Sequence, residues 1–203
     1  DTRFYAACFG CLGYELNLNH LSKMDVQEIQ KQIEFYKNYR TTFQFGSFYR
    51  LKSVKKNQVH WQVMSPDKKK AVAALFQTLS SAAEGFDRLL PEGLDHDKIY
   101  TVNAFPKRLR IKRFGGLVNH ISPVKVHPDG ALLRLADHFY SLPGCQETYE
   151  ASGRQLMAGI MLNNAFNGTG YCEDVRMLGD FDADLYLIKN TEEDEVISDG
   201  HID

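Results

Sequence analysis

The sequence predicts a mainly β protein whose larger part is an antiparallel β-sandwich. After residue 42 most of the chain consists of short runs rich in β-branched and aromatic residues, separated by turn sequences such as Ser65-Pro66-Asp67 and Pro128-Asp129-Gly130. The composition agrees, because the chain has 13 Phe and 10 Tyr, and aromatic residues are enriched in strands. Regularly spaced short strands and turns are typical of a sandwich.

A helix is predicted before these runs, from Met24 to Arg40. Ser22 and Asp25 have the spacing of a capping box, with Asp in place of Glu. Apolar residues then recur at helical spacing on one face, namely Val26, Ile29, Ile33 and Tyr36. The short run 12–17 alternates loosely and predicts a single strand before the helix. Together they form one βα unit without a partner strand in the sequence.

The strands predicted after this helix are short. We expect them at residues 45–51, 59–64, 99–104, 131–135 and 185–189. Residues 69–79 could form a helix by propensity or a buried strand, and the turns that flank them favour the strand. Residues 192–203 contain several acidic residues and no Lys or Arg, which predicts a solvated acidic tail.

Charge and hydropathy exclude several kinds of partner. A formal net charge of −2 gives no field that would attract nucleic acid or anionic lipid. No run approaches the roughly 18 apolar residues that a membrane-spanning helix needs. Cys8 and Cys11 have the spacing of a redox pair or half a zinc site, but no second pair completes a metal site. Free thiols and a reducing cytoplasm are therefore expected.

Three aspartates form the first group that suggests chemistry. Asp180, Asp182 and Asp184 would lie on one face of a strand, where carboxylates can bind a hard cation. The run lacks the glycine and the terminal acid that an EF-hand loop requires. The seven histidines show no pair at zinc-site spacing. We therefore interpret the aspartates as a solvated strand entrance, and predict neither a metal nor a cofactor.

Longer segments carry a more specific signal than these motifs. Seven of them, in matching order and spacing, resemble the C-terminal region of bacterial α-galactosidases of glycoside hydrolase family 36. They are FGCLGYELN at 9–17, IEFYKNYR at 33–40, QFGSFYRL at 44–51, FGGLVN at 114–119, VHPDG at 126–130, FNGTGY at 166–171 and VRMLGDF at 175–181.

The resemblance implies a place in a larger enzyme. In this family an N-terminal β domain precedes a (β/α)8 catalytic barrel, and an antiparallel β-sandwich ends the chain. Residues 1–41 would then be the end of the barrel, with its seventh helix ending at residue 9, its eighth strand at 12–17 and its eighth helix at 24–40. Residues 42–190 would be the sandwich and 191–203 the tail. The implied partners are the rest of the enzyme chain and further copies in a homo-oligomer.

The family hydrolyses terminal α-galactosyl groups of melibiose- and raffinose-type sugars with retention, by means of two aspartates. Their motifs belong to earlier barrel strands and do not occur here, so the resemblance implies no catalytic residue in this chain and no activity of the chain alone. Glu15 and Asn17, at the end of the implied eighth strand, are candidates for the periphery of the substrate pocket. Asn17 stands where the family usually has Asp, and a buried place in the barrel floor is the alternative.

A second function comes from a different class. β-Sandwiches can bind sugars through aromatic side chains, and Trp61 with the many tyrosines would permit a sugar-binding module. Alternating aromatic residues in a sandwich also form its core. The sequence leaves both roles open for Trp61.

Overall fold

The computed structural model describes residues 1–17, 19, 21, 23–81, 87–110, 119, 125, 127, 130–139, 141–143, 147–162 and 179–191. The chain folds into two compact units. One contains Asp1–Phe105, Glu147–Asn163 and Leu178–Asp203, and the other contains Pro106–Gln146 and Asn164–Met177.

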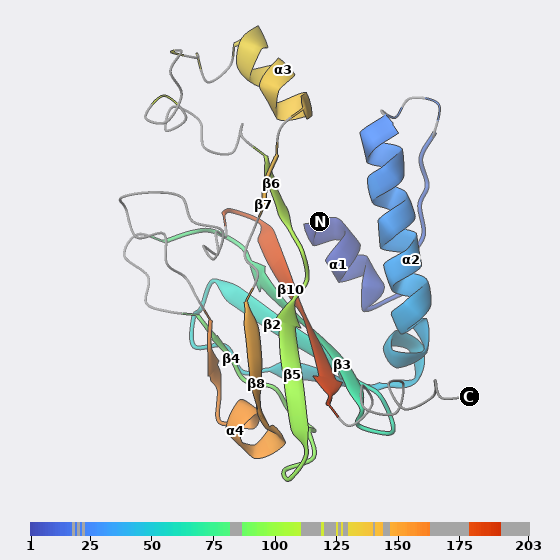
Figure 1. Ribbon diagram of the computed structural model, residues 1–203, viewed down its shortest axis with the longest axis vertical. Coiled ribbons are helices and arrows are strands. Elements are labelled where there is room, and N and C mark those ends of the chain that lie inside the picture. Colours follow the sequence, from blue (N-terminus) through green and yellow to red (C-terminus); the bar gives the residue numbers. More distant parts are fainter. Residues whose placement is uncertain are drawn as a thin grey trace, which may run out of the picture. The chain divides into compact units, whose positions relative to one another are not determined.

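An antiparallel sheet, six-stranded among the described residues, is the centre of the first unit (Figure 1). Its spatial order is β1-β2-β3-β10-β5-β8, so the last strand of the chain lies in the middle. β10 pairs with β3 from Asp182↔Gln77 to Lys189↔Lys70, and with β5 on its other side. The strands are β1 (Ser47–Leu51), β2 (Gln58–Met64), β3 (Lys70–Gln77), β5 (Ile99–Ala104), β8 (Thr148–Ser152) and β10 (Asp182–Asn190).

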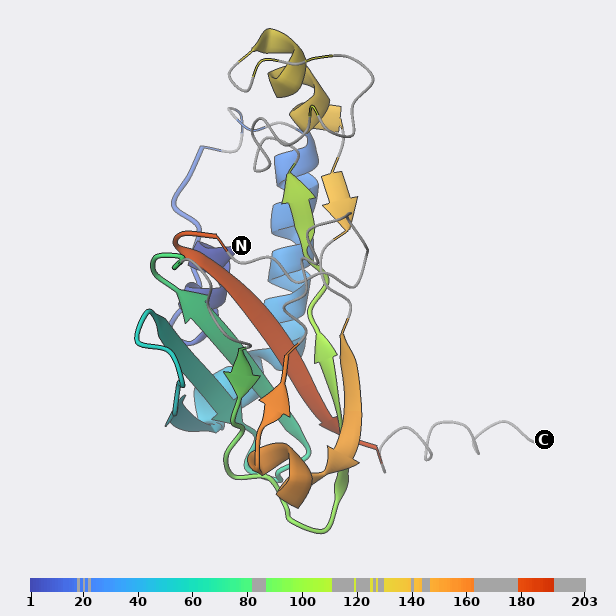
Figure 2. The same ribbon diagram turned by 90° about the vertical axis from the view of Figure 1, so that its left-hand side faces the viewer.

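Both faces of this sheet are covered. α1 (Thr2–Cys8) and α2 (Lys23–Phe45) lie on one side in Figure 1, while α4 (Gly153–Met157) lies on the other. Figure 2 shows the short pair β4 (Arg88–Leu89) and β9 (Ile160–Met161) in front of the sheet. Because side chains of a strand alternate between faces, two separate apolar cores result.

β3 illustrates the division between the two cores. Val72 and Ala74 belong to the core under α1 and α2, while Ala71, Ala73 and Leu75 belong to the core under α4, β4 and β9. All five are completely buried. A strand that is buried on both faces shows a continuous apolar run instead of alternation, which explains why residues 69–79 were ambiguous between helix and strand.

The mainly β class is confirmed, and so are the strands predicted at 59–64, 69–79, 99–104 and 185–189. The predicted helix is present but continues five residues beyond Arg40, to Phe45. Thr42 and Phe43 favour extended backbone, yet both are buried, and Phe43 belongs to the core under the helices. Tertiary packing here outweighs local propensity.

The predicted strand at 12–17 is not seen, since these residues are irregular in this structure, and it stays a prediction for a chain in which a further strand pairs with them. One strand prediction was wrong. Residues 131–135 lie in a helix, α3 (Ala131–Phe139), in the second unit. Its Ala, Leu and Arg residues are strong helix formers, and Leu133 is buried while Leu132 and Leu135 are exposed. The same unit contains the pair β6 (Arg108–Arg110) and β7 (Ser141–Pro143).

The predicted division at residues 41 and 190 stays a prediction, and the acidic tail at 192–203 lies outside the described residues. Among the described helices, none has the length and apolar character to span a bilayer.

Candidate functional site

The predicted pocket residues Glu15 and Asn17 lie in the irregular segment that joins α1 to α2, and both are exposed. The Oδ1 atom of Asn17 accepts a hydrogen bond from the backbone N–H of Asn19 at 3.1 Å. The Tyr14 hydroxyl donates to Oε1 of Gln32 in α2 at 2.5 Å and ties the segment to this helix. Burial, with the nearby Cys8 and Glu28, raises the pKa of Tyr14 to about 12. The tyrosine therefore stays a hydrogen-bond donor.

The three aspartates at the start of β10 have different environments. Asp180 is exposed, and its carboxylate accepts hydrogen bonds from the hydroxyl and the backbone N–H of Ser80, which lower its pKa. Asp182 and Asp184 are buried. Asp182 accepts from the backbone N–H of Gly179 at 3.2 Å and of Ala183 at 2.9 Å. The interpretation as a solvated strand entrance is correct for Asp180 but wrong for the other two, because β10 is a central strand.

A buried polar network, absent from the sequence predictions, lies on the face of the sheet opposite the helices. Lys55 Nζ lies 2.5 Å from Oδ1 of Asp87, and the two side chains are 13% and 5% exposed. Nε2 of Gln58 donates to the same carboxylate at 2.7 Å and to Oε1 of Gln77 at 3.0 Å. Nε2 of His60 lies 3.2 Å from Oε1 of Gln58. One sequence signal was available: Gln58, His60 and Gln62 alternate along β2 and so share a face.

Gln62 extends this network to the backbone of a neighbouring segment. Its Nε2 donates to the carbonyl oxygen of Glu92 at 2.6 Å, and its Oε1 accepts from the N–H of the same residue at 3.2 Å. The side-chain amide thus replaces the paired backbone bonds of an adjacent strand. The segment that follows β4 is held against the sheet by polar contacts as well as by apolar packing.

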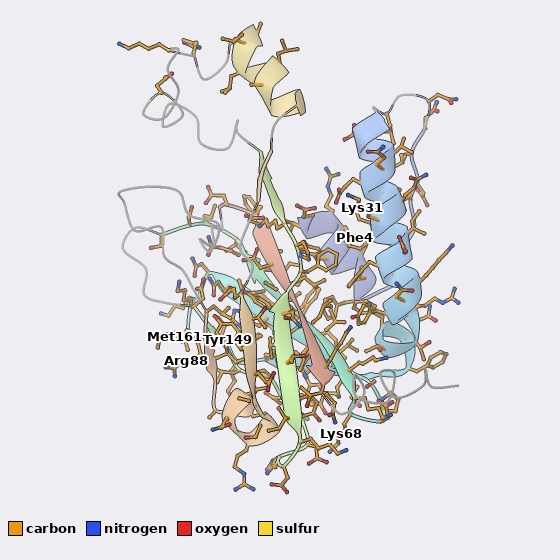
Figure 3. All side chains as sticks on the ribbon, viewed as in Figure 1. Phe4, Lys31, Lys68, Arg88, Tyr149 and Met161 are labelled. Atoms are coloured by element: carbon orange, nitrogen blue, oxygen red, sulfur yellow. The ribbon has the colours of Figure 1, made fainter. Side chains whose placement is uncertain are left out.

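A buried carboxylate, Glu147, lies just before the edge strand β8. It accepts a hydrogen bond from the hydroxyl of Tyr186 at 2.9 Å and one from the hydroxyl of Tyr149. The Tyr149 hydroxyl also lies 3.1 Å from the carbonyl oxygen of Met161 in β9 (Figure 3). These contacts connect β8, β10 and β9.

The chemistry available to these carboxylates is limited by their partners. A retaining glycosidase needs two carboxyl groups about 5 Å apart on either side of the bond that is cleaved. Here Asp87 is bound to Lys55 and Gln58, Glu147 to two tyrosines and Asp182 to backbone N–H groups. In the part of the chain that the structure describes, no group of three or more His, Cys, Asp or Glu side chains is placed to hold a metal. In the observed arrangement Asp87 joins β2 to the segment before β4, Glu147 joins β8 to β10, and Asp182 stabilises the turn that precedes β10.

Trp61 is part of an aromatic cluster on the helix-covered face. Its ring contacts Phe9, Phe48 and Phe76, with ring centroids 4.9–6.1 Å apart. Edge-to-face and tilted contacts of this kind are typical of aromatic packing. A sugar platform needs an open ring face, so the surroundings of Trp61 favour a packing role.

The two described cysteines, Cys8 and Cys11, are both free thiols, as predicted. Cys145 and Cys172 lie outside the described residues. Cys8 is buried and Cys11 is exposed, and burial raises the pKa of Cys8 to about 12. Because the thiolate is the reactive form, this pair differs from a redox-active one, in which one thiol has a lowered pKa.

We expect iodoacetamide at about pH 8 to alkylate Cys11 at least ~100-fold faster than Cys8, since Cys8 is protonated and inaccessible. Peptide mapping by mass spectrometry would follow each site. In denaturant the two cysteines should react at similar rates. Equal rates in the native protein would contradict the burial of Cys8.

A protein-family model matches this chain. The model of the glycosyl hydrolase family 36 C-terminal domain matches residues 58–188, which is more than half of the chain. The chain belongs to glycosyl hydrolase family 36. The match begins at β2 and ends near the end of β10, so it contains five strands of the sheet, with β1 and both N-terminal helices outside it.

The curated relatives of this family 36 chain are α-galactosidases. α-Galactosidase 1 of Pediococcus pentosaceus is 42% identical over 96 residues, which are 47% of this chain and 13% of that protein. α-Galactosidase AgaA of Geobacillus stearothermophilus is 36% identical over 104 residues, 51% of this chain and 14% of that protein. The chain thus corresponds to a small part of each relative's length.

Solved structures extend the likeness beyond the matched domain. The α-galactosidase from Lactobacillus brevis has a TM-score of 0.60 and 28% identity, covering 93% of this chain and 19% of that one. AgaA from Geobacillus stearothermophilus, in complex with raffinose, has a TM-score of 0.59 and 25% identity with the same coverage. Structural similarity therefore includes most of the residues outside the family-model match.

Proposed function

We propose that this chain is the C-terminal part of an α-galactosidase and supports catalytic residues that lie elsewhere in the enzyme. The observation that carries the proposal is the match of residues 58–188 to the C-terminal domain of family 36. The likeness to two α-galactosidase structures, over 93% of this chain and 19% of theirs, supports it further. The carboxylates of Asp87, Glu147 and Asp182 are all bound by other groups of this chain, which agrees with a supporting role.

The reaction of the whole enzyme would be retaining hydrolysis of terminal α-galactosyl groups by two aspartates outside this chain. The structure of AgaA with raffinose supports this substrate class for a relative. α1 and α2 would be the last helices of the catalytic barrel, and residues 12–17 would become a strand once a neighbouring strand pairs with them. Glu15 and Asn17 are exposed, so they would be available at the rim of the pocket.

The first test is an activity comparison. We expect no hydrolysis of p-nitrophenyl α-galactoside or raffinose by this chain alone, because the proposal places the two catalytic aspartates outside it. A joined protein, in which this chain replaces the C-terminal region of Pediococcus pentosaceus α-galactosidase 1, should hydrolyse both. The truncated Pediococcus part, without any C-terminal region, is the control and should lose most of its activity. Turnover by the isolated chain would refute the proposal.

The joined protein also tests the two pocket residues. Glu15→Gln and Asn17→Ala should each raise KM by roughly 3- to 10-fold, the loss expected from one hydrogen bond to the substrate. Glu34→Gln, at an exposed position of α2, is the matched control and should leave KM unchanged. Equal KM values in all three variants would remove Glu15 and Asn17 from the pocket.

A further inference from the structure

Three exposed apolar side chains lie in adjoining loops at the end of the sheet where β10 begins. Phe181 is 70% exposed, Val54 57% and Leu79 55%. Hydrogen bonds join their loops: the N–H of Phe181 donates to the carbonyl of Thr78 at 2.6 Å, and Nδ2 of Asn57 donates to the carbonyl of Leu79 at 2.7 Å. We call Val54, Leu79 and Phe181 the loop-end patch.

The backbone of Phe181 is strained. Its φ of 53° lies in the left-handed region, which is unfavourable for a bulky side chain. The residues on either side are held firmly, since Asp180 is bound to Ser80 and Asp182 to the N–H groups of Gly179 and Ala183. Phe181 lies between these two aspartates and is 70% exposed. Its backbone N–H is bound to Thr78, but its ring is exposed, so contact of the ring with a further surface would offset the unfavourable backbone.

The patch lies next to the N-terminal helix. α1 contributes Phe4, Tyr5 and Cys8 to the core that also contains Ala183 and Leu185 of β10. In Figures 1 and 2 the N-terminus lies at the end of the sheet where β10 begins. In a full-length α-galactosidase, the residues before Asp1 would therefore join the chain beside the loop-end patch.

The length of the related enzymes indicates what would bind to the loop-end patch. This chain corresponds to 13% of α-galactosidase 1 of Pediococcus pentosaceus and 19% of the Lactobacillus brevis structure, so most of such an enzyme lies outside it. Aromatic side chains that insert into a partner dominate the binding energy of many interfaces. Phe181 is exposed and lies between two hydrogen-bonded aspartates, so it has the properties of such an anchor.

We propose that the loop-end patch binds the part of the α-galactosidase that precedes Asp1, with Phe181 as the anchoring ring. This inference rests on the proposed function. The occupant is an apolar surface of the same polypeptide, and docking it offsets the backbone strain at residue 181.

The test compares Phe181→Asn in the isolated chain and in the joined protein. Asn tolerates the left-handed region, so in the isolated chain the substitution should raise Tm by about 2–4 °C. In the joined protein it removes the anchor and should lower Tm by about 4 °C or more. Phe45→Asn is the matched control, because Phe45 is 71% exposed and its φ is not positive. This control should shift Tm equally in both proteins.

Hydrogen exchange gives a second readout. The amides of Leu79 and Ser80 should exchange at least ~10-fold more slowly in the joined protein than in the isolated chain. A rise of Tm by Phe181→Asn in both proteins would overturn the inference. It would also fail if the isolated chain dimerised through the patch and the joined protein did not respond. Loss of activity in the joined protein would count against the proposed function instead, since neither Tm nor exchange depends on turnover.

Discussion

Replacing Asp87 with alanine is expected to lower the free energy of unfolding by about 3–5 kcal/mol, because it removes the carboxylate that lies against a buried ammonium. The Asp87 side chain is 5% exposed and that of Lys55 13%, with 2.5 Å between Nζ and Oδ1. Gln58 would lose an acceptor at 2.7 Å at the same time. Urea unfolding followed by circular dichroism would measure the change.

The matched control is Asp97→Ala. Asp97 forms an ion pair with Arg154 at 3.4 Å, but these side chains are 88% and 71% exposed. Exposed pairs contribute little, so the change should stay below about 0.5 kcal/mol. Replacing Lys55 by Met together with Asp87 by Leu should recover much of the lost stability, since a buried ion pair is often matched by apolar side chains. A loss under about 1 kcal/mol for Asp87→Ala would contradict the buried network.

The difference between these two pairs shows what the sequence could not reveal. Asp87 and Asp97 are both acids near turn residues, and no local pattern distinguishes them. Their environments depend on which segments cover the sheet, and therefore on contacts between distant residues. The alternation of Gln58, His60 and Gln62 would have predicted a polar strand face, but the normal inference from it is a solvent-exposed face. The structure buries it under the β4 segment.

The sequence predicted strands correctly where turn residues flank an apolar run, as for β3 and β5, because the hydrophobic period and the turn residues are local features. It could not predict the order of the strands. β10 pairs with β3 across more than a hundred residues, and this pairing puts Asp182 and Asp184 in the interior. At residues 131–135 the periodicity was misjudged, because a five-residue window of Ala, Leu and Arg fits a helix as well as a strand.

The candidate pocket residues could not be predicted from local patterns. Glu15 and Asn17 came from family resemblance, because no pattern in the residues identifies a pocket there. Both residues are exposed on a segment that Tyr14 joins to α2. This agrees with a position at the rim of the substrate pocket, but exposure alone would not have identified a pocket there. The buried carboxylates around β2 and β8 show the limit of composition: each resembles a catalytic acid until its partners are known.

Gly46→Ala is the second substitution with a large expected effect. Gly46 separates α2 from β1, and its N–H donates to the carbonyl of Thr42 at 2.9 Å. A Cβ atom here would lie 2.4 Å from the carbonyl oxygen of Thr42 and 2.5 Å from that of Met64. Both contacts are with backbone and belong to different elements, so relief requires the end of α2 to move away from β2. We expect a loss of about 3 kcal/mol in the free energy of unfolding.

Gly13→Ala separates this steric effect from the general effect of adding a methyl group. A Cβ atom at Gly13 would meet nothing within 4 Å, so alanine there should change stability by less than about 1 kcal/mol, in the stabilising direction if the unfolded chain loses entropy. Both variants would be unfolded in urea under the same conditions. If they unfolded alike, the helix would not be packed onto β2 as closely as the positions of Gly46 and Met64 require, and the core under α1 and α2 would have to be looser than its buried Phe43 indicates.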